Sequence, residues 1–263
     1  MREVLRIERT QFGGNYNVGL VWALETLAWS PEHLPEASML LARLAALDPG
    51  GNSHPRPAGA LVSIFLPWYP QTTANLDGRI AALEAVAKHV PEVAMKVISE
   101  LFRKSTSSPT HRPAVRDWTA GWREGASDQE IDAIHERIGT LAVTTATTEP
   151  SLWALLVTEL RWLPRSAQDA AYRNLATLEA GRLTDSQQSV LRDSVRRALN
   201  FGATHPDSQN APGRSERELL KRLLERLAPS DVRELHRWLF AGWVHLPVWS
   251  PEISAGIVQK FWR

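Results

Sequence analysis

The sequence contains no cysteine among its 263 residues. Disulfide bonds, a thiolate nucleophile and cysteine-based zinc sites are therefore excluded. It also lacks any apolar run close to the ~20 residues that a membrane-spanning helix needs. The opening residues, Met1 to Val4, do not form a secretory signal. These absences together predict a cytoplasmic protein that does not insert into a membrane.

The net charge of the chain is small, and common catalytic motifs are missing as well. The formal net charge is only +1, which argues against a strong electrostatic field for nucleic acid or a membrane surface. Neither of the glycine-rich phosphate-binding motifs, G-x-x-x-x-G-K-[ST] and G-x-G-x-x-G, occurs. The zinc-binding motif H-E-x-x-H is missing too, because His135-Glu136 has no second histidine one turn later. The eight histidines are scattered, and no G-x-S-x-G turn is present. We therefore predict no catalytic, cofactor or metal site, and a chain that is not an enzyme.

What the sequence does contain is a succession of helical patterns, clearest between Val18 and Thr72. The first helix carries apolar residues at three- and four-residue spacing, and its expected buried stripe is Leu20, Ala23, Leu24, Leu27 and Ala28, with Trp22 and Trp29 on the same line. Ser30 then reads as an N-cap before a second helix from Pro31 to Leu47. That helix is expected to bury Leu34, Ala37, Leu40, Leu41, Leu44 and Ala45.

The rest of the chain repeats the same signals. Asp77, Ser127 and Thr184 are expected N-caps, and Pro91 and Pro150 are expected at the first position of a helix. The predicted helices cover residues 60–68, 77–90, 91–102, 128–145, 150–163, 165–183, 185–201, 214–228 and 230–245. The fullest apolar set belongs to the helix at 91–102, with Val93, Met95, Val97, Ile98, Leu101 and Phe102.

These patterns predict an all-α chain of irregular helical hairpins, stacked as a HEAT-like α-solenoid. The tetrapeptide Trp-Ser-Pro-Glu occurs twice, at 29–32 and 249–252, although no regular period links the helix starts. An irregular globular helical domain is the alternative. We expect arrays at 1–104 and 105–263, with linkers near 103–115 and 202–213, or one continuous solenoid. Both ends of the sequence lack polar caps, which suggests a piece of a longer protein.

One cluster has the composition of a binding surface. Phe65, Trp68 and Tyr69 lie close in sequence to Arg56 and Arg79, and aromatic residues with arginine are typical of interaction hot spots. The alternative is that these residues simply pack the core around a short helix. We predict that the five residues contact a protein partner.

A second candidate is the basic run from Arg214 to Arg237. Glutamates interleave with its arginines, so the pattern is typical of a solvated helix face with salt bridges. Contact with nucleic acid is the alternative interpretation of this run.

The opening stretch resembles the helical-repeat region of large bacterial anti-phage proteins, the STAND-type NTPases of the Avs kind, over about residues 18–104. The motifs that carry the resemblance are Trp22-Ala23-Leu24-Glu25, Leu27-Ala28-Trp29, Leu41-Ala42-Arg43-Leu44-Ala45, Asp48-Pro49-Gly50-Gly51, Arg56-Pro57, Ile64-Phe65, Trp68 and Pro70-Gln71-Thr72. In that family an effector and an NTPase precede a helical sensor. The resemblance implies a sensor or scaffold that recognises a foreign protein, without NTPase or effector activity in this chain.

Three functions therefore stand as predictions. The first is a protein-binding helical scaffold, with a phage protein as a possible partner. The second is a free-standing helical protein that binds a small molecule in a pocket lined by several of its 11 tryptophans. The third is a nucleic-acid-binding helical array, which would bind with steep salt dependence.

Overall fold

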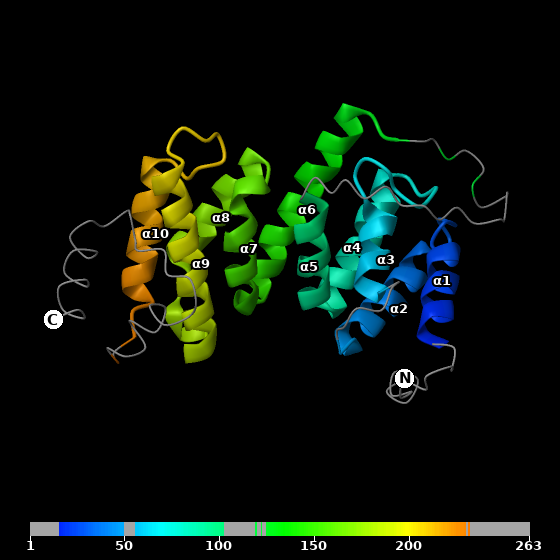
Figure 1. Ribbon diagram of the computed structural model, residues 1–263, viewed down its shortest axis with the longest axis horizontal. Coiled ribbons are helices and arrows are strands. Elements are labelled where there is room, and N and C mark those ends of the chain that lie inside the picture. The colour runs from blue at the N-terminus through cyan, green and yellow to red at the C-terminus, as the bar shows by residue number, and fades with distance from the viewer. Residues whose placement is uncertain are drawn as a thin grey trace. The chain divides into compact units, whose positions relative to one another are not determined.

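The computed structural model describes residues 16–49, 56–102, 119, 122, 125–229 and 231. Throughout these ranges the regular structure is helical and contains no strand (Figure 1), which confirms the all-α prediction. The chain forms two compact units, residues 1–145 and 146–263. Among the described helices, none combines the length and the apolar character that crossing a membrane requires.

The first unit is built from consecutive helices that pack on their neighbours in sequence. They are α1 (Tyr16–Leu27), α2 (Leu34–Leu47), α3 (Pro57–Phe65), α4 (Leu76–His89), α5 (Pro91–Phe102) and most of α6 (Asp128–Thr148). Helix α2 packs on α3 and α4, α3 also packs on α5, and α4 packs on α5. Helix α1 packs on α2 and α3. Helix α2 also packs on α5, so α2 contacts all four of the other helices from α1 to α5.

Helix α5 forms the best-buried side of this unit. All six apolar residues that the sequence marks on it are buried, and its start at Pro91 is confirmed. Helix α3 was expected at 60–68, and its expected apolar residues Ala60, Leu61, Ile64 and Phe65 are buried. The helix ends at Phe65, so Trp68, also expected on it, lies in the following loop and is half-buried. On α3 the apolar side chains recur at three- and four-residue spacing, whereas α5 is apolar and buried around most of its circumference.

The start of α2 differs from the prediction. The helix begins at Leu34 with His33 as its N-cap residue, so Ser30 is not the cap and Pro31 lies in the preceding turn. Pro35 explains the difference, because in a helix begun at Pro31 its ring would clash with the carbonyl of residue 31, four positions earlier. Leu40 is 38% exposed, while Ser38 is buried in its place.

Trp22 is a second correction. It is 53% exposed, whereas Trp29 is fully buried. The two residues are seven apart, but α1 ends at Leu27, so Trp29 lies beyond the helix and does not extend the stripe of Trp22. Leu20 is 38% exposed and Ala23 is exposed too, whereas Leu24 is buried as predicted. Val21, which the predicted stripe did not include, is buried beside it.

Besides Ser30, two further N-caps were predicted in the first unit, Asp77 and Ser127, and the one at Asp77 is wrong. Asn75 caps α4, because its side-chain oxygen accepts a hydrogen bond from the Gly78 amide at 2.9 Å. Asp77 lies inside the first turn and pairs with Arg137 at 2.9 Å. Ser127 caps α6 as expected: its hydroxyl accepts from the Glu130 amide at 3.3 Å.

The second unit contains α7 (Trp153–Glu159), α8 (Arg165–Thr177), α9 (Asp185–Thr204) and α10 (Arg214–Arg226), with 3₁₀ turns η3 (Pro150–Leu152), η4 (Leu160–Trp162) and η5 (Ala180–Arg182). Helix α7 packs on α9, α8 packs on α10, and α9 packs on α10. The predicted N-cap at Thr184 is confirmed. It forms a capping box, since the Thr184 side chain accepts from the Gln187 amide and the Gln187 side chain accepts from the Thr184 amide.

Helix α8 is shorter than expected. It ends at Thr177 instead of running on to Leu183, because Leu178 takes an extended conformation. The carbonyls of Leu175 and Ala176 accept hydrogen bonds from Arg226 at 2.8 and 2.7 Å. A side chain from α10 thus satisfies carbonyls that a continued helix would have used itself.

The expected linkers and ends are only partly described. Residues 103–115 lie outside the described residues, as do the helix expected at 230–245, the second Trp-Ser-Pro-Glu and residues 1–15. In the second stretch, 202–213, α9 continues to Thr204 and residues 205–213 connect it to α10. The division expected at 104/105 stays a prediction.

An ion pair holds the start of α8 to the start of α10 and predicts a pH dependence. Glu216 lies 2.6 Å from Arg165. Burial raises the pKa of Glu216, but hydrogen bonds from the backbone, Arg165 and Ser215 outweigh it, so the pKa is lowered below 4.5. A carboxylate with a lowered folded-state pKa stabilises the fold above its unfolded pKa, and this contribution is lost as pH falls through the folded value.

We expect Glu216→Gln to reduce the loss of stability between neutral pH and pH ~3, measured by urea denaturation of the second unit at several pH values. Glu179→Gln, at an exposed position of the same unit, is the matched control and should keep the wild-type pH profile. An unchanged profile in Glu216→Gln would contradict the assignment.

Candidate functional site

The loop after α3 is joined to the segment before α6. The carbonyl of Trp68 accepts a hydrogen bond from the Ala126 amide at 3.1 Å. Gly125 precedes it with a φ of 84°, a conformation that favours glycine. The turn at Gly125 therefore brings residues 125–127 onto the loop that carries Trp68 and Tyr69.

Trp122 completes this contact. Its indole nitrogen donates a hydrogen bond to the carbonyl of Pro70 at 2.9 Å. Its ring makes edge contacts with Trp29 at 5.4 Å and with Tyr69 at 5.2 Å between centroids. We call Trp29, Tyr69 and Trp122 the aromatic junction. The aromatic junction holds together three segments that are far apart in sequence. Edge-to-face pairs of aromatic rings stabilise a fold by more than the burial of their apolar area alone.

The five predicted contact residues do not share one environment. Phe65 is 1% exposed and lies in the core, and Arg79 is 7% exposed. Arg56, Trp68 and Tyr69 are half-buried. Only these last three have side chains that are partly accessible to solvent.

Arg56 has a clear structural role. It is the N-cap residue of α3, and its guanidinium pairs with the Asp48 carboxylate at 2.9 Å. Asp48 directly follows α2. The pair therefore joins the end of α2 to the start of α3 across residues 50–55.

Arg79 is a buried cation on α4. Its Nε and Nη1 atoms have no hydrogen-bond partner among the described residues. Burial lowers the pKa of Arg79, and the nearby carboxylate of Glu130 raises it, with a lowered pKa as the net result. Its position favours a role inside the first unit over direct contact with a partner.

The most exposed apolar side chains lie elsewhere in the first unit. Among the described residues, six large apolar side chains are exposed, and four of them belong to α1 and α2: Leu20, Trp22, Leu40 and Leu47. We call these four the α1/α2 apolar residues. Figure 1 shows α1 beside α2 at the start of the described chain. Sequence reasoning missed them because helical spacing placed three of them, Leu20, Trp22 and Leu40, on buried stripes.

The basic residues of α10 are mostly engaged within the second unit. Arg226 donates to the end of α8, Arg217 donates to the Pro212 carbonyl at 3.2 Å, and Lys221 pairs with Glu218 at 2.9 Å. Arg222 donates to the Glu218 carbonyl at 3.4 Å. These contacts fit the salt-bridged helix face that the sequence indicated.

No group of three or more side chains suited to a metal ion occurs within the described ranges.

Comparison with known proteins finds a short similar stretch. The chain is similar to a UPF0758 protein of Thiobacillus denitrificans, with 38% identity over 82 residues. The similar stretch covers 28% of this chain and 37% of that protein, so the chain spans little more than a third of that relative's length. No protein-family model and no solved structure matches.

Proposed function

We propose that this chain is an α-helical scaffold that binds a protein partner through the first unit. The observation that carries the proposal is the exposure of Trp22, at 53%, on a helix that is apolar around most of its circumference. Tryptophan is enriched in binding hot spots, and α1 and α2 carry four of the six exposed large apolar side chains among the described residues.

We further propose that both units are segments of an α-solenoid. In stacked helical hairpins each helix packs on the next one and the next but one. In the first unit α1 packs on α2 and α3, α2 packs on α3 and α4, and α3 and α4 both pack on α5. In the second unit α7 packs on α9, and α8 and α9 pack on α10. In such an array α1 is the first described helix, and its outer apolar residues are the surface on which a partner binds.

The nature of the partner rests on the resemblance over residues 18–104. It makes this chain the sensor segment of a cytoplasmic bacterial defence NTPase, and the partner a phage protein. In this reading the NTPase and the effector belong to other parts of the system, since the sequence has neither phosphate-binding motif.

The experiment uses the whole chain as bait in lysates of phage-infected and uninfected bacteria. Proteins recovered only from infected cells are then purified, and their binding is measured by calorimetry. We expect Trp22→Ala to weaken binding by about 30-fold, the effect of a typical hot-spot residue, with an unchanged circular dichroism spectrum. Trp68→Ala tests in the same way whether the half-buried loop residue is also in contact.

Trp162→Ala is the matched control, because Trp162 is a tryptophan of the second unit with 43% exposure. It should bind the purified partner as tightly as the wild-type chain. Equal binding of Trp22→Ala and wild type, or a failure of every recovered protein to bind in purified form, would overturn the proposal.

A further inference from the structure

A cavity of about 190 Å³ opens in the second unit, among α7, η4, α8, α9 and the connection 205–213. Arg161 and Arg197 both line it, and none of its lining side chains is acidic. Phe201 and Pro212 contribute an apolar wall. Two cations without an opposing carboxylate favour an anionic ligand over a neutral or cationic one.

The guanidinium of Arg161 is held by stacking. Its carbon lies 4.8 Å from the centroid of the Phe201 ring and 4.9 Å from that of Trp162. Arg161 forms no hydrogen bond or ion pair with the described residues, so its N–H groups stay available at the edge of the stacked plane. A guanidinium oriented in this way binds a carboxylate or phosphate through two parallel hydrogen bonds.

Arg197 lies on α9 and supplies further donors. Its Nη2 atom donates to the Ser194 hydroxyl at 3.0 Å, which fixes one side of the guanidinium. The other N–H groups make no contact with the described residues. Ser194 itself is 1% exposed, so a buried hydroxyl anchors this cation.

A buried tyrosine adds a neutral donor to the same cavity. Tyr172 is 8% exposed and lines the cavity. Burial, together with the negative charge of Glu216, raises the pKa of Tyr172 to about 12. The hydroxyl therefore stays protonated at neutral pH and can donate to an anion.

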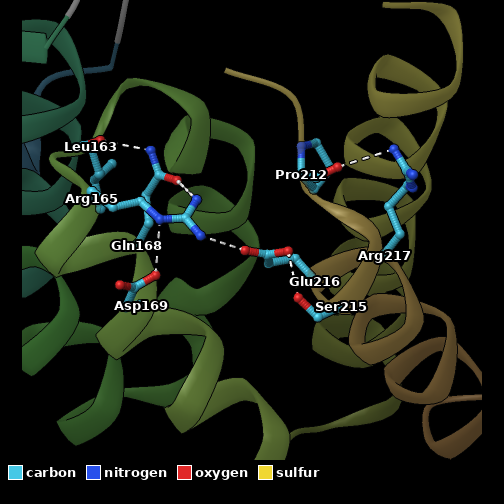
Figure 2. A network of polar contacts seen from close by, with 8 residues as sticks. All are labelled: Leu163, Arg165, Gln168, Asp169, Pro212, Ser215, Glu216 and Arg217. Atoms are coloured by element: carbon cyan, nitrogen blue, oxygen red, sulfur yellow. Dashed lines mark hydrogen bonds and ion pairs between the residues drawn. The ribbon is translucent and has the colours of Figure 1, made fainter. Parts of the chain in front are cut away.

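The polar contacts beside the cavity keep its wall in place (Figure 2). The Gln168 amide donates to the Leu163 carbonyl at 2.8 Å. Arg165 pairs with Glu216 at 2.6 Å and with Asp169 at 3.2 Å, which engages the nearest carboxylates. Figure 2 also shows Arg217 donating to the carbonyl of Pro212, whose ring lies on the other side against α9 at Gly202. The cavity is thus built before a ligand arrives, which lowers the cost of binding.

We propose that this cavity binds a small organic oxyanion, a carboxylate or a phosphate monoester on a small apolar body. The oxyanion accepts hydrogen bonds from Arg161, Arg197 and the Tyr172 hydroxyl, and the apolar body packs against Phe201. The volume is below the ~300 Å³ at which pockets for drug-sized ligands begin, so the ligand has the size of a single-ring acid. This site is independent of the partner surface on the first unit.

The test follows the chain by NMR during titration with benzoate, phenyl phosphate, inorganic phosphate and benzamide. Benzamide has the shape of benzoate without its charge. We expect saturable shifts of the Arg161 and Arg197 side-chain signals with benzoate or phenyl phosphate, and binding of benzamide weaker by about tenfold or more. The stronger of the two organic anions identifies the carboxylate or the phosphate as the natural group.

Variants complete the test. Arg161→Gln and Arg197→Gln should each weaken the preferred anion by about tenfold, the usual effect of losing one charge-assisted pair. Arg173→Gln, at an exposed arginine of α8 outside the cavity, should leave binding unchanged. Equal binding by all three variants, benzamide binding as tightly as benzoate, or inorganic phosphate binding as tightly as phenyl phosphate would each overturn the proposal.

Discussion

Trp29→Ala is expected to lower the free energy of unfolding of the first unit by about 3–5 kcal/mol, the range for large aromatic residues in cores. Trp29 is fully buried, and its ring contacts Trp122 in the aromatic junction. Removing the indole leaves a void between α1 and the loop after α3, because the Trp29 carbonyl holds Thr73 there through two hydrogen bonds of 2.9 and 3.1 Å. The loss is measured by urea denaturation followed by hydrogen exchange of α2 and α3 amides.

The variant Trp29→Phe separates the contribution of the packed ring from that of the buried indole N–H. The indole nitrogen of Trp29 is buried with no hydrogen-bond partner among the described residues, and a buried donor without a partner costs about 1–3 kcal/mol. Phenylalanine removes this donor and keeps most of the ring, so we expect Trp29→Phe to cost less than half as much as Trp29→Ala. Equal losses in the two variants would contradict this account.

Trp22→Ala is the matched control for stability. Because the side chain is 53% exposed, its truncation should change the free energy of unfolding by no more than about 0.5 kcal/mol. The same variant is expected to weaken partner binding by about 30-fold. The two tryptophans, seven residues apart, therefore separate stability from function in one helix and the turn that follows it.

Arg192→Ala is expected to cost the second unit about 3 kcal/mol, by the loss of a buried hydrogen bond from a charged group together with the void left behind. Arg192 is 3% exposed, and its Nη1 atom donates to the Leu227 carbonyl at 2.9 Å. Leu227 directly follows α10, where the helix dipole favours a positive charge. The loss is measured by denaturation with hydrogen exchange of α9 and α10 amides.

Arg192→Met keeps the length of the side chain and removes only the charge and its hydrogen bonds. We expect it to cost about half as much as Arg192→Ala, since the void is filled while the Leu227 carbonyl loses its donor. Arg182→Ala, at an exposed arginine of η5, should be nearly neutral. A neutral Arg192→Ala would show that the guanidinium does not hold the end of α10.

Arg192 and Arg226 make the same kind of contact in the second unit. Each extends from one helix to the last carbonyls of another, Arg226 to those of α8 and Arg192 to that of α10. These contacts satisfy carbonyls that a helix leaves unpaired at its C-terminal end. The Arg226 contact lies at the point where α8 stops, before the end that its sequence pattern suggested.

The sequence by itself determined which segments are helical and how several of them begin. Thr184 and Ser127 cap helices because each side chain reaches an amide three residues ahead, and Pro91 begins one because its missing N–H would be unpaired there anyway. The buried face of α5 could be predicted as well, since its spacing repeats through three turns. All of these signals act within a turn or two of the chain.

Only the tertiary structure decided which of two tryptophans with equivalent helical spacing is buried, and which side chains meet around the cavity. Trp22 and Trp29 are equivalent by spacing, and their burial differs because α1 ends between them and Trp122, from beyond α5, covers one. The cavity gathers Arg161, Tyr172 and Arg197 from separate helices and turns. Burial and charge pairing are set by contacts between distant segments, and no local pattern encodes those contacts.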